Sequence, residues 1–316
     1  MRWVTGVVAA GVLAVLAGCG GAAAAPWRLV IATGGREGVY YAYGQGIAKA
    51  ARERLPEAKP QVISTGASVE NLRLVGEGRA DVAFALADSA ALAFEGRPPF
   101  AAREPVVALA RLYENYTHLV VPADSGIRRL PDLKGRVVSL GAAGSGTELI
   151  ATRLLTVAGV DPKQGVRVRR LQVGDAADAL RGGHVDAFFF SGGLPTGAIA
   201  DLARTMPIRL IDLSAYVEPL ERRYRAFYEE RSILASTYGL AGQVRTIGVP
   251  NYLVVNASMP EERAYRLTRL LFTRRDELAA AHPEALHLNR RSAVSTYPLP
   301  LHPGAMRYYR EAKRQG

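Results

Sequence analysis

The stretch Arg28-Leu-Val-Ile-Ala-Thr-Gly-Gly-Arg-Glu-Gly38 sets the architecture of this chain, because an apolar run is followed at once by a glycine-rich turn. Residues 28–32 have the composition of a short buried strand. Residues 40–55 have the length of a helix, which Pro56 ends. A strand, a tight turn and a helix in this order predict a β-α-β unit and a mainly parallel sheet.

The same order returns in the second half of the chain. Arg136-Val-Val-Ser-Leu140 predicts a strand, Gly141-Ala-Ala-Gly-Ser-Gly-Thr147 a glycine turn, and residues 148–158 a helix that Gly159 ends. This repetition predicts two lobes of similar α/β architecture.

A shorter pattern marks a matching strand in each half. Gly78-Arg-Ala-Asp-Val-Ala-Phe84 and Gly183-His-Val-Asp-Ala-Phe-Phe189 share the form Gly-x-x-Asp-small-x-Phe. We interpret Asp81 and Asp186 as structural residues that cap the turn before a buried strand, in preference to a catalytic role.

Two extended runs are predicted to connect the lobes, at residues 116–122 and 244–256. A predicted helix over residues 260–281 and the tail after it have no counterpart in the pattern of strands and helices that forms a lobe. The chain is therefore expected to return to the first lobe. Two crossovers between two lobes make a hinge with a cleft beside it. The predicted organisation is lobe 1 over residues 27–120 and 250–316, and lobe 2 over residues 121–249.

The N-terminal residues have the layout of a secretory signal. Met1 and Arg2 precede an apolar run over residues 3–16, and Leu-Ala-Gly-Cys19 resembles the lipobox of bacterial lipoproteins. We predict a lipoprotein signal peptide at residues 1–18, acylation of Cys19, and a tether at residues 19–26 whose seven residues after Cys19 reach roughly 23 Å. The alternative is a plain signal anchor with an incidental cysteine. The lipoprotein interpretation places the folded body outside the cytoplasm, in the periplasm or at the cell surface, held by membrane lipid.

The composition and the absence of several motifs exclude a number of functional classes. The 316 residues carry a formal charge of +11, but no block of like charges forms a basic arm, so no nucleic-acid partner is expected. One cysteine excludes an intramolecular disulfide. The sequence has no P-loop and no Gly-x-Ser-x-Gly elbow. Its five histidines show no metal-ligand spacing. We therefore expect no metal, no cofactor and no enzymatic activity.

The two glycine turns are the candidate binding elements. Each precedes a helix at the carboxyl end of a strand, where backbone N–H groups and the helix dipole favour anions. They contribute Thr33, Gly34 and Gly35 in the first lobe, and Ser145, Gly146 and Thr147 in the second. Such turns also occur as purely structural βα connections.

Further candidates lie beside these turns. Tyr40 opens the first predicted helix, and Asn71 lies in the first turn of the next one, from which its amide could donate into the cleft. Ser191 and Pro195 follow a strand of the second lobe, and Ser89 stands at the corresponding strand end of the first. The alternative for each is a packing role.

Together these motifs make the chain similar to a known family from Leu29 to Tyr309. It resembles the TAXI group of extracytoplasmic solute receptors for tripartite (TRAP) transporters. The segments that carry the resemblance are Ala32-Thr-Gly-Gly35 with Gly38-Val-Tyr-Tyr41, Ser64-Thr-Gly-Ala-Ser-Val-Glu-Asn71, Asp132-Leu-Lys-Gly-Arg136, Gly144-Ser-Gly-Thr147, and Leu301-His-Pro-Gly-Ala305 with Tyr308-Tyr309.

The resemblance implies a two-lobed periplasmic-binding-protein fold of the second topological class. It implies a receptor that closes on a glutamate- or glutamine-like amino acid or a dicarboxylate such as 2-oxoglutarate, and delivers it to a permease driven by an ion gradient. The ligand-binding residues carried over are Thr33 to Gly35, Tyr40, Asn71, Ser145, Gly146, Thr147 and Ser191. The chain departs from the family pattern at Ala42, Ala67 and Glu148. Many relatives have Arg in place of Glu148, so the net charge of the ligand stays open.

Two other functions remain open from the sequence. One is a ligand-sensing lipoprotein that signals to a membrane kinase. The other is an enzyme on the same two-lobed fold, although no activated nucleophile or His–acid pair is visible.

Overall fold

The computed structural model describes residues 26–314. The predicted signal peptide, Cys19 and all of the predicted tether except Pro26 lie outside these residues. No helix within the described residues combines the length and hydropathy needed to cross a membrane.

The first half of the fold is built from alternating strands and helices, as predicted. In chain order they are β1 (Trp27–Ala32), α1 (Val39–Arg54), β2 (Ala58–Ile63), α2 (Ser68–Gly76), β3 (Val82–Leu86) and α3 (Ala87–Glu95). Strands β1 and β2 pair in parallel, as do β1 and β3. The strand is formed by residues 27–32 because five of those six side chains are buried between helices on the two faces of the sheet.

The second half repeats this arrangement with shorter strands. Its elements are β5 (Val137–Ser139), α4 (Gly146–Val157), β6 (Arg167–Arg169), α5 (Val173–Arg181), β7 (Ala187–Gly192), α6 (Gly197–Thr205), β8 (Ile208–Leu210), α7 (Val217–Tyr224) and β9 (Glu229–Ile233). Strand β5 pairs in parallel with both β6 and β7.

The two halves use one aspartate in the same structural way. Asp81 accepts a hydrogen bond from the backbone N–H of Val30, at 2.7 Å. Asp186 accepts the equivalent bond from Val137, also at 2.7 Å. Each aspartate therefore fixes the strand that it precedes to the neighbouring strand, which confirms the structural interpretation of both residues.

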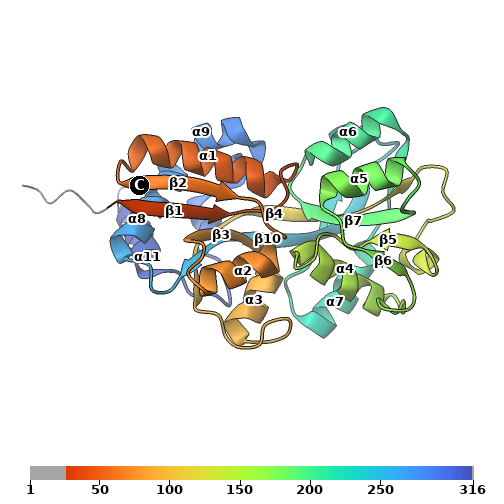
Figure 1. The fold of residues 1–316 in the computed structure, drawn as a ribbon, viewed down its shortest axis with the longest axis horizontal. Helices are drawn as coiled ribbons and strands as arrows, with labels where there is room; N and C mark the ends of the chain where they lie inside the picture. The colour runs from red at the N-terminus through yellow and green to blue at the C-terminus, as the bar shows by residue number, and fades with distance from the viewer. Residues whose placement is uncertain (1–25, 315–316) are drawn as a thin grey trace, which may run out of the picture.

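Two long strands run through both halves: β4 (Val106–Pro122) and β10 (Val244–Asn256). They are antiparallel to each other, and Tyr116 pairs with Gly248. At that pair both strands change partner, because β4 continues against β7 and β10 meets β9. The sheet order is β2-β1-β3-β10-β4-β7-β5-β6, with β8 beside β4 and β9 beside β10. Figure 1 shows these two strands joining the halves.

The predicted fold class is confirmed: the chain is a two-lobed α/β protein whose lobes are linked by two crossing strands. The strands that belong to one lobe pair in parallel, and the crossover strands β4 and β10 pair with their neighbours in the antiparallel direction. The run 244–256 coincides with β10. The other predicted crossover, 116–122, is only the end of β4, which begins ten residues earlier at Val106.

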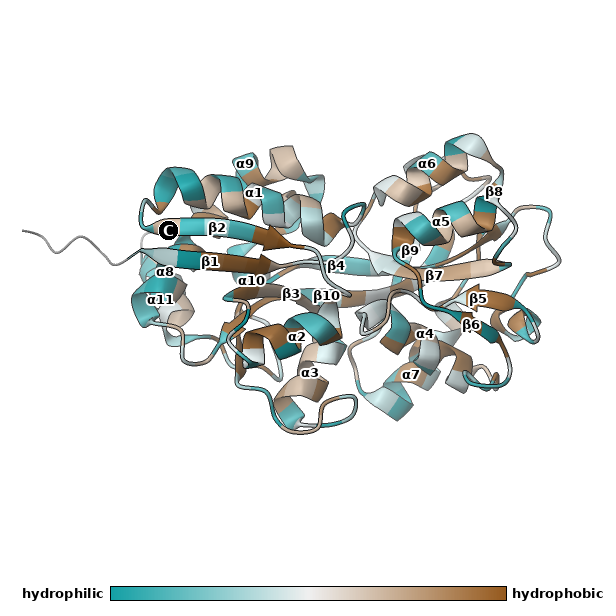
Figure 2. Cartoon of the chain, in the orientation of Figure 1, coloured by the Kyte–Doolittle hydropathy of each residue, from teal (hydrophilic) through white to brown (hydrophobic). Residues whose placement is uncertain are grey.

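The C-terminal segment returns to the first lobe, as Figure 1 shows. It contains α8 (Glu261–Thr273), α9 (Arg275–Ala281), α10 (Arg290–Ala293) and α11 (Pro303–Arg314). The single helix predicted over residues 260–281 is wrong, because the structure breaks it at Arg274. Helix α9 packs on α1, where Leu278 and Ala281 approach Gly46. Figure 2 shows hydrophobic residues along β1 and hydrophilic ones over much of α5, α8 and α11.

Candidate functional site

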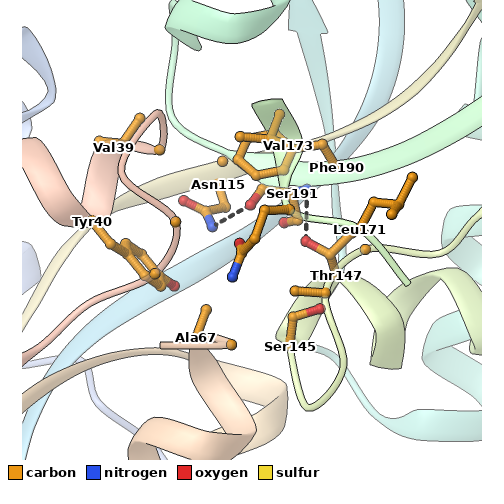
Figure 3. A pocket seen from close by; sticks show the side chains of 18 residues that line it. Val39, Tyr40, Ala67, Asn115, Ser145, Thr147, Leu171, Val173, Phe190 and Ser191 are labelled. Atoms are coloured by element: carbon orange, nitrogen blue, oxygen red, sulfur yellow. Dashed lines mark hydrogen bonds between the residues drawn. The ribbon is translucent and has the colours of Figure 1, made fainter. Parts of the chain in front are cut away.

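A cavity of about 50 Å³ lies between the lobes, beside the point where β4 and β10 change partner. It is lined by residues of both lobes and of β4: Gly34, Gly35, Gly38, Val39, Tyr40, Gly66, Ala67, Asn115, Gly141, Ala142, Ser145, Thr147, Leu171, Gln172, Val173, Phe190, Ser191 and Gly192. Figure 3 shows Ser145 and Thr147 on one side of this cavity and Tyr40 on the other.

Four helices begin at the cavity. Their first residues or the residues just before them line it: Val39 for α1, Ala67 for α2, Ser145 for α4 and Val173 for α5. A helix N-terminus presents unsatisfied backbone N–H groups and the positive end of the helix dipole. Four of them around one small space create a positive potential that favours an anion.

The N-terminus of α4 keeps donors available for a ligand. Within residues 26–314, the backbone N–H groups of Gly146 and Thr147 have no hydrogen-bond acceptor. The N–H of Gly144 is already satisfied, because the Glu148 carboxylate accepts it at 2.9 Å. In the facing lobe the Glu70 carboxylate accepts the N–H of Gly66 in the same way, at 2.5 Å. The carboxylates of Glu148 and Glu70 therefore accept hydrogen bonds beside the cavity and do not occupy its centre.

Three hydroxyl groups add to these donors. Ser145 Oγ accepts the N–H of Glu148 at 2.9 Å, and Thr147 Oγ1 accepts the N–H of Ser191 at 3.1 Å. Both hydroxyl hydrogens remain free to point toward a ligand. Ser191 Oγ is buried and has no hydrogen-bond partner within the described residues. A buried hydroxyl without a partner costs free energy unless a ligand or water satisfies it.

A buried chain of hydrogen bonds crosses the floor of the site from one lobe to the other. The hydroxyl of Tyr40 donates to Asn251 on β10, and the Asn251 amide donates to Asn115 on β4. The Asn115 amide then donates to the Ser191 carbonyl at 3.2 Å. Burial raises the pKa of the Tyr40 hydroxyl above its usual value, so the group stays protonated. The ring of Tyr40 is fixed by stacking on Phe84.

The lining is uncharged. None of its eighteen residues is Asp, Glu, Lys, Arg or His. The nearest acidic groups described above, Glu148 and Glu70, are bound to backbone N–H groups, and Glu148 also accepts from Arg170 at 2.5 Å. Within residues 26–314 no group of three or more potential metal ligands is close enough to hold an ion. The site can therefore bind a polar anion through neutral donors, with apolar contacts from Val39, Leu171, Val173 and Phe190.

The structure brings six of the eleven predicted ligand residues to the cavity wall: Gly34, Gly35, Tyr40, Ser145, Thr147 and Ser191. Of the other five, Gly146 stands between the lining residues Ser145 and Thr147, and the remaining four lie elsewhere. Ser89 is buried beside Asp88, Pro195 lies in the loop between β7 and α6, and Thr33 donates to the Ile63 carbonyl at 2.7 Å.

Asn71 and Gly146 have roles that differ from those expected. The Asn71 amide does not donate into the cleft, because it donates to the carbonyls of Thr33 at 2.6 Å and Phe84 at 2.8 Å. It thus ties β1 to β3. At Gly146, an added β-carbon would lie 2.5 Å from Leu86 Cδ1 and 2.8 Å from Ser68 Oγ. Glycine is needed there because the lobes touch.

Several lining residues had no sequence signal strong enough to select them. Asn115 and Asn251 lie in long strands that carry other polar residues, among them Glu114, Thr117 and Thr246, so no sequence signal distinguishes them. Gln172 precedes α5 and donates across the cleft to the Thr65 carbonyl at 3.0 Å. The Gly144 carbonyl accepts the N–H groups of Val69 and Glu70 across the same gap. These interlobe bonds show that the structure is a closed form.

Two α/β lobes joined by crossing strands, with a polar cavity at the crossing point, define the architecture of the periplasmic solute-binding proteins. The chain belongs to the NMT1-like family, which it matches over residues 31–312.

Solved structures are similar to this chain at low sequence identity. XAC2383 from Xanthomonas citri bound to ATP is 18% identical, with 91% of this chain and 96% of that chain covered and a TM-score of 0.51. An ancestral arginine-binding protein bound to arginine is 17% identical, with 81% and 97% covered and a TM-score of 0.50. The periplasmic aliphatic sulphonate binding protein SsuA from Escherichia coli is 17% identical, with 91% and 84% covered and a TM-score of 0.48.

Proposed function

We propose that this protein is an extracytoplasmic solute receptor that captures a small carboxylate-bearing solute in the cavity between its lobes. The observation that carries the proposal is the convergence of four helix N-termini on one uncharged cavity. Backbone N–H groups of Gly146 and Thr147 and the hydroxyls of Ser145, Thr147 and Ser191 would bind one carboxylate. The Gly34–Gly35 turn and the start of α1 would bind a second polar end.

The candidate solutes are glutamate- or glutamine-like amino acids and dicarboxylates such as 2-oxoglutarate. Neutral donors at helix N-termini stabilise carboxylates without arginine or lysine. This agrees with Glu148 at the position where many members of the resembled family have arginine. Tyr40 would contact the remaining polar group of the solute. The cavity lining contains no histidine, acid or lysine that could act as a general base, which favours binding over catalysis.

The rest of the proposal concerns delivery. We propose that Cys19 is acylated, that residues 19–26 tether the body to a membrane, and that the solute passes to a TRAP-type permease. The hinge would lie at the Tyr116–Gly248 pair, where both crossover strands change partner. The proposed boundaries, at residues 120/121 and 249/250, lie within a few residues of this pair. Solute that contacts both lobes would favour the closed form by differential affinity.

The first experiment identifies the solute. Small molecules released from protein purified under mild conditions are analysed by mass spectrometry, and the candidates are then tested by thermal unfolding. A ligand at one hundred times its dissociation constant stabilises a protein by about 2.7 kcal/mol. At roughly 2–4 °C per kcal/mol, the midpoint should rise by about 5–10 °C. Acetate, which has one polar end, should give almost no shift.

A pair of serine variants tests the site itself. Ser191→Ala removes the buried hydroxyl in the cavity and should weaken binding by about tenfold. Ser236→Ala removes an exposed hydroxyl that does not line the cavity and should leave binding unchanged. A panel in which a sugar stabilises the protein and no carboxylate does would overturn the proposed ligand class. Uptake assays with the permease genes present or deleted distinguish transport from sensing.

A further inference from the structure

The first lobe carries two neighbouring hollows, beside α8, α9 and α10, whose walls are rich in arginine. One is lined by Arg274, Arg275, Arg290 and Arg291, and the other by Arg54, Arg266, Arg269 and Arg274. The hollows share Thr273 and Arg274, so they form one continuous surface. We call these seven arginines the arginine face. Asp276 and Glu277 are the only acidic residues that line the same hollows.

Four arginines of this face are available to an outside partner. Arg54, Arg269, Arg290 and Arg291 are exposed, and none of them has a carboxylate within 4.0 Å among residues 26–314. The other three are paired: Arg266 with Glu57, Arg274 with Glu277, and Arg275 with Asp276. The segment 261–314 as a whole carries eleven Lys or Arg and six Asp or Glu. The face therefore has an excess of positive charge that the described residues do not neutralise.

The described part of the chain begins beside this face. Trp27 begins β1, and the guanidinium of Arg263 on α8 lies 4.9 Å from its ring centre. The backbone N–H of Trp27 donates to the Glu57 carbonyl at 2.7 Å, and the Glu57 side chain pairs with Arg266 of the face. Figure 1 shows β1 beginning at the end of the molecule where α8 and α11 lie. The described chain therefore begins close to the arginine face, and the apolar run 3–16 precedes that point in the sequence.

We propose that the arginine face binds the anionic headgroups of a membrane and orients the receptor with its first lobe against the bilayer. Arginine donors match phosphate groups in charge and geometry. A basic surface is attracted to anionic lipid within about one Debye length, roughly 10 Å at 0.1 M salt. Such an orientation leaves the second lobe free to rotate. The inference does not depend on the identity of the solute, so its failure would leave the proposed binding function untouched.

Vesicle sedimentation tests this proposal. All described helices and strands lie within residues 27–314, so a chain that begins at Gly20 keeps the whole described fold and removes the predicted anchor. The probes are vesicles of phosphatidylglycerol and phosphatidylcholine, or of phosphatidylcholine alone, at 20 and 300 mM salt. The face variant combines Arg54→Gln, Arg269→Gln, Arg290→Gln and Arg291→Gln. The control combines Arg128→Gln, Lys163→Gln, Arg167→Gln and Arg169→Gln, which removes the same charge from exposed positions of the second lobe.

We expect the unmodified chain to bind the anionic vesicles at low salt and to lose most of that binding at 300 mM. The face variant should bind at least tenfold more weakly, and the control should stay within about twofold. Thermal unfolding checks that both variants fold. An equal loss in both variants, full binding by the face variant, or no preference for anionic lipid would overturn the proposal. Face-dependent binding to a DNA duplex without vesicle binding would also overturn it, by assigning the surface to nucleic acid.

Discussion

The guanidinium of Arg153 on α4 donates to the carboxylate of Asp88 on α3, 2.9 Å away, across the interface between the two lobes. Both side chains are buried, at 9% and 0% exposure. The Tyr228 hydroxyl donates to the same carboxylate at 2.9 Å. A buried ion pair is sensitive to the loss of one partner, because the other charge remains without compensation. This pair therefore couples the position of α4, which begins at the cavity, to the first lobe.

Asp88→Asn should destabilise the protein because it leaves the Arg153 charge buried without a counter-charge. Removing one partner of such a pair costs about 3–5 kcal/mol. Urea unfolding followed by circular dichroism measures the change. Asp201→Asn is the matched control, since its pair with Arg204 is exposed and should contribute less than about 0.5 kcal/mol. Equal effects of the two substitutions would show that the buried pair does not hold the lobes.

Gly146→Val should weaken solute binding by at least tenfold, about 1.4 kcal/mol. The physical reason is contact between the lobes, since the new side chain would meet Leu86 and Ser68 and hinder closure. Isothermal titration calorimetry with the identified solute measures the loss. The control is Gly126→Val, where an added β-carbon meets no atom of the described chain within 4 Å. Full-strength binding by a normally folded Gly146→Val protein would contradict this account of closure.

Asn115→Ala should lower both stability and affinity. The substitution leaves the Asn251 amide and the Ser191 carbonyl without their partner at the floor of the cavity. An unsatisfied buried polar group costs about 1–3 kcal/mol. Urea unfolding measures the stability, and calorimetry measures the affinity. Unchanged values for both would mean that the chain from Tyr40 to Ser191 is not needed to hold the lobes at the site.

His118 should make the protein less stable as the pH falls from 6.5 to 4. Burial lowers the pKa of this histidine to about 4 in the folded state. In the unfolded chain its pKa is about 6.5, so between these values the unfolded state binds a proton that the folded state does not. The linkage reaches about 3 kcal/mol at pH 4.

The matched comparison for this prediction is His118→Gln, which cannot take up that proton. Urea unfolding at pH 7, 6, 5 and 4 gives the free energy of unfolding of both proteins. The difference between the two free energies of unfolding should change by about 3 kcal/mol from pH 7 to pH 4. The wild type should lose more stability than the variant as the pH falls. Parallel curves for the two proteins would show that folding does not lower the pKa of this histidine.

Local patterns in the sequence determined the repeating units of the fold. Apolar runs, glycine turns and helix-ending residues predict β1, α1 and the corresponding elements of the second half to within a few residues, because each signal lies within the segment that it shapes. The same locality explains why Asp81 and Asp186 were interpreted correctly. The hydroxyls of Ser145 and Thr147 were also selected because they belong to a glycine turn.

Only the tertiary structure decided which side chains meet across the lobes. Asp88 and Arg153 are separated by 65 residues, and Asn251 and Asn115 by 136, so no pattern along the chain marks them as partners. The inward direction of Asn71 and the contact of Gly146 with Leu86 depend on neighbouring strands and on the approach of the second lobe. Periodicity fixes which face of an element is buried. What that face touches is set by the packing of distant elements, because contact depends on distance in space and not along the chain.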